Sequence, residues 1–268
     1  MKFTKMHANG NDYIYIDTHS QKVAHPEKYA RFLCDRHFGV GGDGLVLLCP
    51  SEEGDFRMRI FDPDGTEAEL CGNALQCSGA LYALSRGTRK TEVNVATQAG
   101  IRKVSLRFDG DGVAEVSVAL PYPKLLFSDH RILLGERFFH SSYISFGNPH
   151  CVVFTEELSD EYFLAYASRL EKHPLFPNRA NVEFAKIISE NRFAMRTWER
   201  GCGETLSCST GSAAAVYAAY IQKLCGTRVF VEQPGGTITV EVDPAKDELT
   251  VSSQAKIVFW GEIPDFTE

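Results

Sequence analysis

The sequence predicts an α+β protein built from two pseudo-symmetric lobes that arose by internal duplication. The stretch FRMRIFDPDGTEAELC, which begins at Phe56, aligns without a gap with FAMRTWERGCGETLSC, which begins at Phe193. The offset is 137 residues, and at this same offset Gly10-Asn11 aligns with Gly147-Asn148. Matches that stay in register over most of each half indicate a repeat. A chain of 268 residues also suits two lobes of ordinary size better than one small domain.

Each half is predicted to contain the same elements in the same order. A strand pair surrounds the repeated Gly-Asn, and a helix, two strands, a second helix and three closing strands follow. Alternating β-branched and aromatic residues support the strands, and the small residues from Ser212 to Ala215 suit a tightly packed helix. The expected ranges are 2–17, 27–36, 44–62, 72–85 and strands ending near 120, then 138–154, 161–171, 181–199, 209–223 and strands ending near 254.

The boundary between the lobes is expected near residues 121–135. Pro121 and Pro123 interrupt the strand pattern there. We therefore expect an N-terminal lobe over 1–125 that carries Cys71, and a C-terminal lobe over 126–268 that carries Cys208. The last strand is free to return to the first lobe. The active site is expected in a cleft between the two lobes.

Composition and charge exclude several classes of function. The chain is 44% hydrophobic and 24% charged, as in globular proteins. Its net charge of -7 argues against nucleic acid or an anionic membrane as the main partner. No apolar run approaches membrane-spanning length, and the opening MKFTKM is typical of a strand rather than a signal peptide. These features predict a cytoplasmic protein that binds a small molecule.

The eight cysteines do not predict a metal site. Without an export signal they are expected to be thiols in a reducing compartment. Their spacing fits no zinc pattern, because the chain has no Cys-x-x-Cys and the interval from Cys71 to Cys77 is too wide. Six of them are most simply small buried hydrophobic residues. The remaining two are the repeated pair, Cys71 and Cys208.

Each repeated cysteine stands just before a predicted helix. Cys71 is followed by Gly72-Asn73, and Cys208 is followed by Ser209-Thr210. Backbone N–H groups and the positive end of the helix dipole gather at such a position. Both stabilise a thiolate, so the sequence predicts a lowered pKa for these cysteines. The same N–H groups are able to hold a substrate carboxylate.

Two such cysteines, one in each half, suit the inversion of an amino-acid α-carbon. One sulfur, as a thiolate, removes a proton from one face, and the other, as a thiol, adds a proton to the opposite face. In the reverse reaction the two roles exchange. The alternatives are two structural cysteines at helix starts or a disulfide pair. Repetition of both the cysteine and its polar neighbours favours catalysis.

With these residues identified, the sequence resembles the diaminopimelate epimerase family over nearly the whole chain. The segment from Met6 to Asp12 resembles the opening motif of that family, and the segment from Asp35 to Gly44 resembles its Gly-rich segment. Cys71-Gly72-Asn73 with Cys77 resembles the first active-site signature. The second signature is matched by Trp198-Glu199-Arg200-Gly201, Gly203-Glu204-Thr205 and Cys208. Further family-like segments are Gly147-Asn148-Pro149-His150 and Arg179-Ala180-Asn181.

The resemblance implies two lobes, each a curled β-sheet or barrel around a central helix. It also implies interconversion of LL- and meso-diaminopimelate in lysine and cell-wall synthesis, with no cofactor, no pyridoxal phosphate and no metal. Family members are commonly homodimers. By match, Cys71 and Cys208 are the two acid/base residues. The matching substrate-binding positions are Gly72, Asn73, Ser209 and Thr210 for the reacting carboxylate, Glu199 at the reacting end, and Asn11, Asn148, Asn181, Arg200 and Asp62 for the distal group.

Three departures from the family pattern concern the signatures. Asp62 stands where the family usually has Asn, Gln76 where an arginine commonly precedes the last cysteine, and Ser209 where glycine is commoner. They leave both cysteines in place and bear on the far end of the substrate. A related racemase acting on histidine, or with broad specificity, is therefore an alternative. A non-catalytic small-molecule binder is another, although a binder needs neither thiol.

Overall fold

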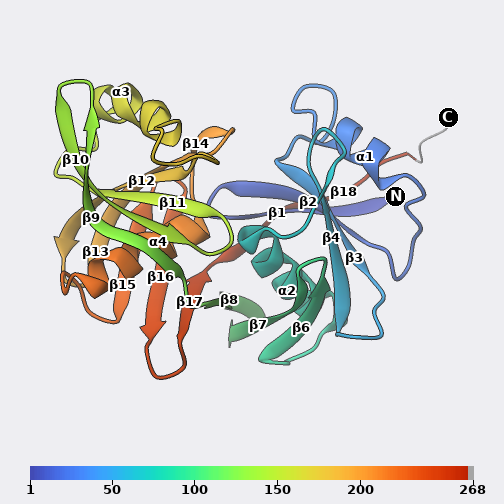
Figure 1. The fold of residues 1–268 in the computed structure, drawn as a ribbon. Helices are drawn as coiled ribbons and strands as arrows, with labels where there is room; N and C mark the ends of the chain where they lie inside the picture. Colours follow the sequence, from blue (N-terminus) through green and yellow to red (C-terminus); the bar gives the residue numbers. More distant parts are fainter. Residues whose placement is uncertain (265–268) are drawn as a thin grey trace. The chain divides into compact units, whose positions relative to one another are not determined.

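The computed structural model describes residues 1–264 and divides the chain into two compact units. Unit 1 comprises Met1–Val118 together with the C-terminal segment from Ser253, and unit 2 comprises Ala119–Ser252. Each unit is a curled, mixed β-sheet with one helix against its concave side and one further helix (Figure 1).

Unit 1 has nine strands among the residues that the structure describes, in the order β18-β1-β2-β3-β4-β6-β7-β8, with the short β5 beside β4. The pairs β2–β3 and β4–β6 are parallel, and the other pairs are antiparallel. The strands are β1 (Lys2–Ala8), β2 (Asn11–Asp17), β3 (Gly44–Cys49), β4 (Phe56–Phe61), β5 (Glu67–Ala68), β6 (Glu92–Thr97), β7 (Gly100–Asp109), β8 (Gly112–Pro121) and β18 (Ala255–Glu262), and the helices are α1 (Pro26–Leu33) and α2 (Gly72–Arg86).

Unit 2 repeats this arrangement, with the order β9-β10-β11-β12-β13-β15-β16-β17 and the short β14 beside β13. The pairs β11–β12 and β13–β15 are parallel, at the positions equivalent to the parallel pairs of unit 1. The strands are β9 (Lys124–Leu134), β10 (Arg137–Ser145), β11 (Pro149–Phe154), β12 (Asn181–Ser189), β13 (Arg192–Glu199), β14 (Gly203–Thr205), β15 (Arg228–Gln233), β16 (Gly236–Asp243) and β17 (Glu248–Ser253), and the helices are α3 (Asp160–Glu171) and α4 (Ser209–Ile221).

The last strand of each repeat belongs to the other unit. Strand β9 follows the first repeat in sequence but pairs with β10 of unit 2. Strand β18 follows the second repeat but pairs with β1 of unit 1. The duplication predicted from the sequence is thus confirmed at the level of sheet topology. The outer strand of each sheet therefore comes from the end of the other half of the chain, β18 in unit 1 and β9 in unit 2.

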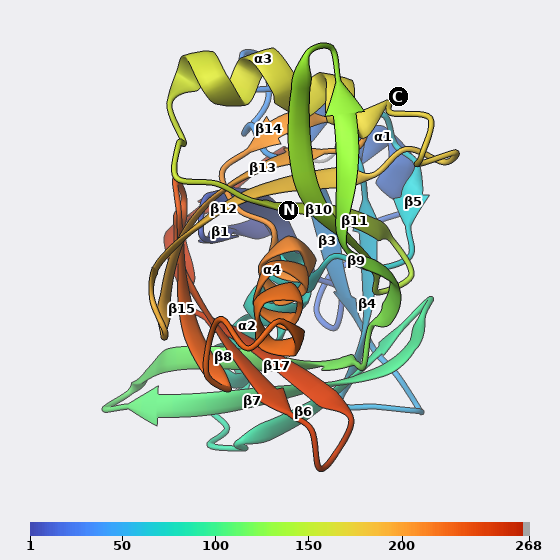
Figure 2. The ribbon, with the colours of Figure 1, turned by 60° about the vertical axis from the view of Figure 1, so that its left-hand side comes forward.

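The two central helices are buried on nearly all sides, because a curled sheet surrounds each of them. Helix α2 is buried from Asn73 to Leu81, and α4 is buried from Gly211 to Ala219. Small side chains allow this close approach, and α4 lies against β10, β11, β12 and β16 (Figure 2). Helices α1 and α3 are amphipathic and cover the sheets from outside. No helix among residues 1–264 is long and apolar enough to cross a lipid bilayer.

The stretch expected to separate the lobes is largely regular structure. Residues 124–134 form β9, and Pro121 and Pro123 occupy only the end of β8 and the short connection that follows it. Proline lacks an N–H donor, so it is tolerated at a strand end but does not interrupt the next strand. The short strands β5 and β14 were also not predicted, because two or three residues carry no periodic signal.

The aromatic core of unit 2 provides a test of its stability. Phe163 on α3 is fully buried and packs edge-on against Phe184, while its neighbour Leu164 is 53% exposed. We expect Phe163→Ala to lower the free energy of unfolding by about 3–5 kcal/mol, since it leaves a cavity. Leu164→Ala on the same helix should change it by less than about 0.5 kcal/mol. Denaturant unfolding measures both, and equal effects would contradict this description of the core.

Candidate active site

Cys71 lies at the N-cap of α2, where the extended backbone of the β5–α2 connection turns into the helix. The hydroxyl of Tyr13 donates a hydrogen bond to its Sγ at 3.3 Å, and Sγ lies 3.6 Å from Oδ1 of Asn11. The side chain of Asn73, in the first turn of α2, donates to the same Asn11 oxygen at 3.2 Å. Gly72 is the first residue of the helix. Unit 1 therefore brings together four residues of the candidate site, Cys71, Asn11, Gly72 and Asn73, with Tyr13 beside them.

A network of charged groups fixes the orientation of Asn11. Its Nδ2 donates to Oδ2 of Asp43 at 2.8 Å, so its Oδ1 faces Cys71 and Asn73. Arg36 pairs with both Asp43 and Asp12, and Lys5 pairs with Asp12 at 2.6 Å. Burial raises the pKa of Asp12, but hydrogen bonds from Arg36 and Lys5 outweigh it and lower this pKa to about 2. Asp12 is therefore ionised at neutral pH.

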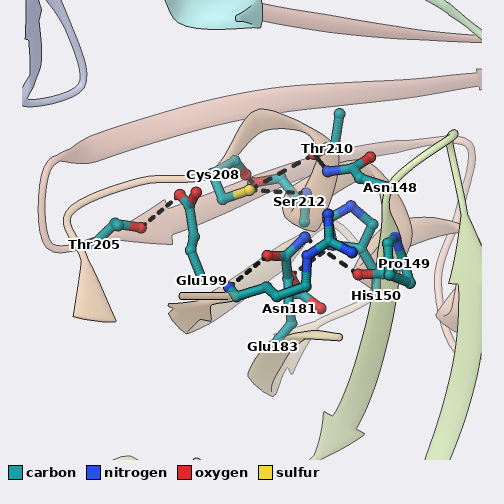
Figure 3. Close-up of polar contacts among 12 residues, drawn as sticks. Asn148, Pro149, His150, Asn181, Glu183, Glu199, Thr205, Cys208, Thr210 and Ser212 are labelled. Atoms are coloured by element: carbon teal, nitrogen blue, oxygen red, sulfur yellow. Dashed lines mark hydrogen bonds and ion pairs between the residues drawn. The ribbon is translucent and has the colours of Figure 1, made fainter. Parts of the chain in front are cut away.

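Cys208 occupies the equivalent N-cap of α4. Its Sγ accepts a hydrogen bond from the backbone N–H of Gly211 at 3.4 Å and lies 3.7 Å from Oγ1 of Thr210. Asn148 donates to Thr210 Oγ1 at 3.2 Å, which repeats the contact between Asn11 and Asn73 in unit 1 (Figure 3). Ser209 is the first residue of α4 and is buried. Unit 2 thus brings together Cys208, Ser209, Thr210 and Asn148.

Glu199, at the end of β13, points towards Cys208 (Figure 3). Its Oε1 accepts a hydrogen bond from the hydroxyl of Thr205 at 2.8 Å, and its carboxyl also forms a hydrogen bond with the side chain of Cys208. Burial raises the pKa of Glu199, and the nearby Glu183 raises it further, whereas the contacts with Thr205 and Cys208 lower it. Glu199 is therefore placed to exchange a proton with the Cys208 sulfur.

The expected lowering of the cysteine pKa is wrong for Cys208. The hydrogen bond from the Gly211 N–H lowers this pKa, as the helix-start argument required. Burial is the larger effect, and the carboxylates of Glu199 and Glu183 add to it, so the pKa of Cys208 lies well above its usual value. The sequence predicted Glu199 only as a substrate contact at the reacting end, and it missed Glu183, which comes from strand β12. In this structure Cys208 is a neutral thiol at neutral pH.

A buried ion-pairing contact lies beneath the first turn of α4. Nδ1 of His150 is 2.8 Å from Oε1 of Glu183, and both side chains are fully buried. A Cβ on Gly211 would meet Glu183 Oε1 at 2.6 Å, so only glycine fits at this point of the helix. The contact between His150 and Glu183 is internal to unit 2. Nε2 of His150 has no hydrogen-bond partner among the described residues.

Asn181 and Arg200 lie together, but their side chains make different contacts. The amide of Asn181 accepts from the backbone N–H of Arg200 at 2.8 Å and donates to the carbonyl of Pro149 at 3.2 Å. It thereby holds the β13–β14 turn against the start of β11. The guanidinium of Arg200 donates to the carbonyl of Asn178 at 3.1 Å and pairs with no carboxylate within residues 1–264. Its positive charge is exposed and uncompensated there.

Asp62 lies in the tight turn that joins β4 and β5. Its backbone N–H donates to the carbonyl of Thr66, and its carbonyl accepts from the N–H of Gly65, each at 2.8 Å. Its side chain is half-buried, and no basic side chain in the described part of the protein pairs with it. Burial and the charge of Asp64 raise the pKa of Asp62. A side-chain hydrogen bond with Thr66, within the same turn, acts in the opposite direction on this pKa.

Several residues that hold the site together were not predicted. Tyr13 and Asp43 contact Cys71 and Asn11, while Gln233 accepts from the Cys208 N–H and donates to the hydroxyl of Ser212. For Tyr13 the sequence did contain a signal of a position near the cysteine, because Tyr13 aligns with His150 at the same offset of 137 residues as the two cysteines. Gln233 and Asp43 have no such signal, since their contacts depend on strands that are distant in sequence.

Glu67 and Glu204, which the sequence analysis left out of the site, form equivalent ion pairs in the two repeats. Glu67 pairs with Arg59 at 2.7 Å, and Glu204 pairs with Arg196 at 2.8 Å. Each pair joins a long strand to the short strand that leads to the cysteine. Within residues 1–264, no cluster of three or more His, Cys, Asp and Glu side chains is arranged to hold a metal ion.

Comparison with known proteins finds one family that matches both repeats. The sequence model of the family described as diaminopimelate epimerase matches residues 3–119 and again 142–258. A diaminopimelate epimerase of Desulforudis audaxviator is 42% identical over 276 residues, covering 98% of this chain and 99% of the relative. One of Agathobacter rectalis is 38% identical over 282 residues, with the same coverage.

The chain belongs to the diaminopimelate epimerase family. The predictions of this family and of an isomerase are therefore confirmed. Solved structures show the same fold at low identity. A phenazine biosynthesis protein of the PhzF family from Bacillus anthracis is similar with a TM-score of 0.72 at 18% identity, covering 98% of this chain and 99% of that one. A hydroxyproline epimerase from Agrobacterium vitis has a TM-score of 0.71 at 15% identity, covering 97% and 91%.

The environment of Cys208 predicts how its reactivity responds to Glu199. The carboxylate of Glu199 opposes the Cys208 thiolate, so Glu199→Gln should lower the pKa of Cys208. The rate of Cys208 alkylation at neutral pH should then rise by about tenfold, which corresponds to one pKa unit. Mass spectrometry of the Cys208 peptide measures this rate. Glu204→Gln is the matched control, since Glu204 lies in the same hairpin but pairs with Arg196. An unchanged or slower rate in Glu199→Gln would contradict the electrostatic account.

Proposed function

We propose that this protein interconverts LL- and meso-2,6-diaminopimelate by proton transfer between two cysteines and the α-carbon, in lysine and peptidoglycan precursor synthesis. The observation that carries the proposal is that a cysteine occupies the N-cap of the central helix in both repeats. One acid/base residue then comes from each predicted lobe, 1–125 and 126–268. The names and high coverage of the relatives support diaminopimelate as the substrate.

The proposed reaction moves one proton off the carbon and another onto it. In one direction, the Cys71 thiolate takes the α-proton as the carbon–hydrogen bond breaks. The Cys208 thiol then donates its proton to the opposite face, and its sulfur is left as a thiolate. The raised pKa of Cys208 supports its role as the acid in this direction. In the reverse direction the roles exchange, and Glu199 is placed to accept or return the Cys208 proton.

The reacting carboxylate is proposed to bind at the two helix starts. The first-turn N–H groups of a helix have no partner within it and attract negative charge. Gly72 and Asn73 supply such groups at α2, and Ser209 and Thr210 supply them at α4. Negative charge that develops on the carboxylate as the proton leaves is stabilised by the same donors. No metal or cofactor is required for this scheme.

The distal end of the substrate is proposed to bind Arg200 and the three asparagines. The exposed guanidinium of Arg200 is available for a bidentate contact with a carboxylate. Asn181 also holds the Arg200 backbone in place, since both ends of its amide bind main-chain groups. Asn11 and Asn148 stand beside the two cysteine sites. Asp62 is proposed to take the distal ammonium group.

Asp62 also supports a second candidate, a racemase with the same chemistry on histidine or several amino acids. A carboxylate in place of the family's usual asparagine would favour substrates with a basic side chain. A non-catalytic binder is the third candidate, and the presence of both N-cap cysteines argues against it.

We further propose a cytoplasmic homodimer, in which a second copy covers the exposed Val258, Phe259 and Trp260 of β18.

Replacement of either cysteine tests the two-base mechanism. We expect Cys71→Ala and Cys208→Ala each to lower the rate of epimerisation by roughly a hundredfold to ten-thousandfold, since each removes a positioned acid/base group. Alanine fits both N-cap positions, so the variants should fold. Epimerisation of LL-diaminopimelate in heavy water, with deuterium followed at the α-carbon, measures the effect. Cys225→Ala, which lies beyond the end of α4, is the control and should retain its activity. Near-normal inversion by either site variant would exclude two-base catalysis.

Comparison of substrates tests the role of Asp62. If Asp62 binds the distal ammonium and Arg200 the distal carboxylate, Asp62→Asn should keep diaminopimelate turnover within about tenfold, or roughly 1.4 kcal/mol. Glutamate, whose acidic side chain has no compensating ammonium, should be a poor substrate. The panel is diaminopimelate, histidine, lysine and glutamate, with Asp64→Asn in the same turn as the control. A preference of the unchanged protein for histidine or lysine would establish the racemase alternative.

A further inference from the structure

The environment of the Cys71 sulfur contains a hydroxyl group that the two-base scheme does not use. Tyr13 Oη lies 3.3 Å from Cys71 Sγ, with the hydroxyl as donor and the sulfur as acceptor. On the same sulfur, Asn11 Oδ1 at 3.6 Å is able to accept only from the protonated thiol. Tyr13 therefore favours the thiolate of Cys71, and Asn11 favours its thiol.

The ring of Tyr13 is held so that the hydroxyl has little freedom to leave the sulfur. Tyr13 is only 6% exposed, and its ring packs edge-on against Tyr15 with centroids 6.4 Å apart. A Cβ on Gly44 would come within 2.8 Å of the Tyr13 ring, so the glycine at the start of β3 leaves space for it. Tyr13 is therefore a buried residue whose ring is fixed beside Cys71, and it is not a surface side chain.

The hydroxyl remains a donor over the working pH range of an enzyme. Burial raises the pKa of Tyr13 well above its usual value, and the neighbouring Cys71 raises it further. The ionisable groups that act on this hydroxyl are Cys71 at the start of α2 and Asp43 before β3, with Tyr15 on the same strand. The hydrogen bond that Tyr13 donates therefore supports negative charge on the Cys71 sulfur.

The repeat shows that this arrangement is specific to one half. Tyr13 aligns with His150, whose Nδ1 contacts Glu183. In place of a tyrosine hydroxyl, Cys208 has the carboxyl of Glu199 near its sulfur, and this carboxyl opposes the thiolate. The two cysteines thus have opposite local environments, although their backbones occupy equivalent positions.

We propose that Tyr13 is a positioning residue for Cys71, whose hydroxyl holds the sulfur and favours its thiolate form, so that Cys71 is the base and Cys208 the acid in the resting enzyme. The inference rests on the proposed function, because it assigns resting states to the two proposed acid/base residues. It adds a residue that acts through Cys71 and does not itself touch the substrate.

The test measures the thiol itself, so its outcome does not depend on which amino acid is the substrate. The rate of alkylation of the Cys71 peptide by iodoacetamide is followed from acidic to alkaline pH by mass spectrometry. In Tyr13→Phe, the rate at neutral pH should fall by about tenfold and the midpoint of the profile should move to higher pH by about one unit. Tyr15→Phe is the matched control, since it removes an equally buried hydroxyl that donates to Ala74 O at 3.4 Å. Its profile should match that of the unchanged protein.

Activity provides a second measurement. Epimerisation by Tyr13→Phe should lose kcat more than it changes KM, because Cys71 is less often the base while the binding groups remain. An unchanged alkylation profile in a folded Tyr13→Phe protein would overturn the inference, whatever the substrate proves to be. If the variant does not fold, replacement of tyrosine by 3-fluorotyrosine makes the hydroxyl a stronger donor. The Cys71 profile should then move to lower pH, and an absence of any shift would equally overturn the inference.

Discussion

Burial of a helix that begins at a cysteine is the constraint on which both sites depend. A curled sheet surrounds α2 and α4, whose residues are buried over most of their length, and this packing fixes the direction and depth of each helix start. The N-cap sulfur and the first-turn N–H groups are consequently held by the core of the unit, without support from a mobile loop. Mutations in these helix cores should therefore disturb the position of the sulfur before they disturb its chemistry.

The duplicated scaffold does not make the two sites chemically equal. Asn73 donates to Asn11 in unit 1, and Asn148 donates to Thr210 in unit 2, so the same two positions are in contact at both helix starts although the donor differs. The ionisable groups are not preserved, since carboxyl groups raise the pKa of Cys208 while a tyrosine hydroxyl contacts Cys71. The proposed two-base reaction requires one thiol and one thiolate at the same moment, and unlike surroundings favour a different form at each cysteine.

The sequence was informative where a feature is local or repeated. The repeat predicted the order of the strands, and the cysteines before helical runs were correctly placed at the N-caps. Prediction failed where the relevant group comes from a distant strand. Burial of Cys208, with the carboxylates of Glu199 on β13 and Glu183 on β12, raises its pKa and outweighs the lowering expected from the helix start alone. Strand β9 was missed for a related reason, because its partner strand decides its structure more than its own pattern does.

The exchange of end strands has a consequence for the origin of the chain. A protein made of one repeat alone would end in a strand that its own sheet does not accept, because β9 pairs with β10 and β18 pairs with β1. Two copies would complete each other by trading that strand, as in a domain-swapped dimer. The present chain is then what results when two such copies are joined end to end. In a symmetric pair of that kind both cysteines would be identical, whereas in a single chain each cysteine is free to have its own acidity.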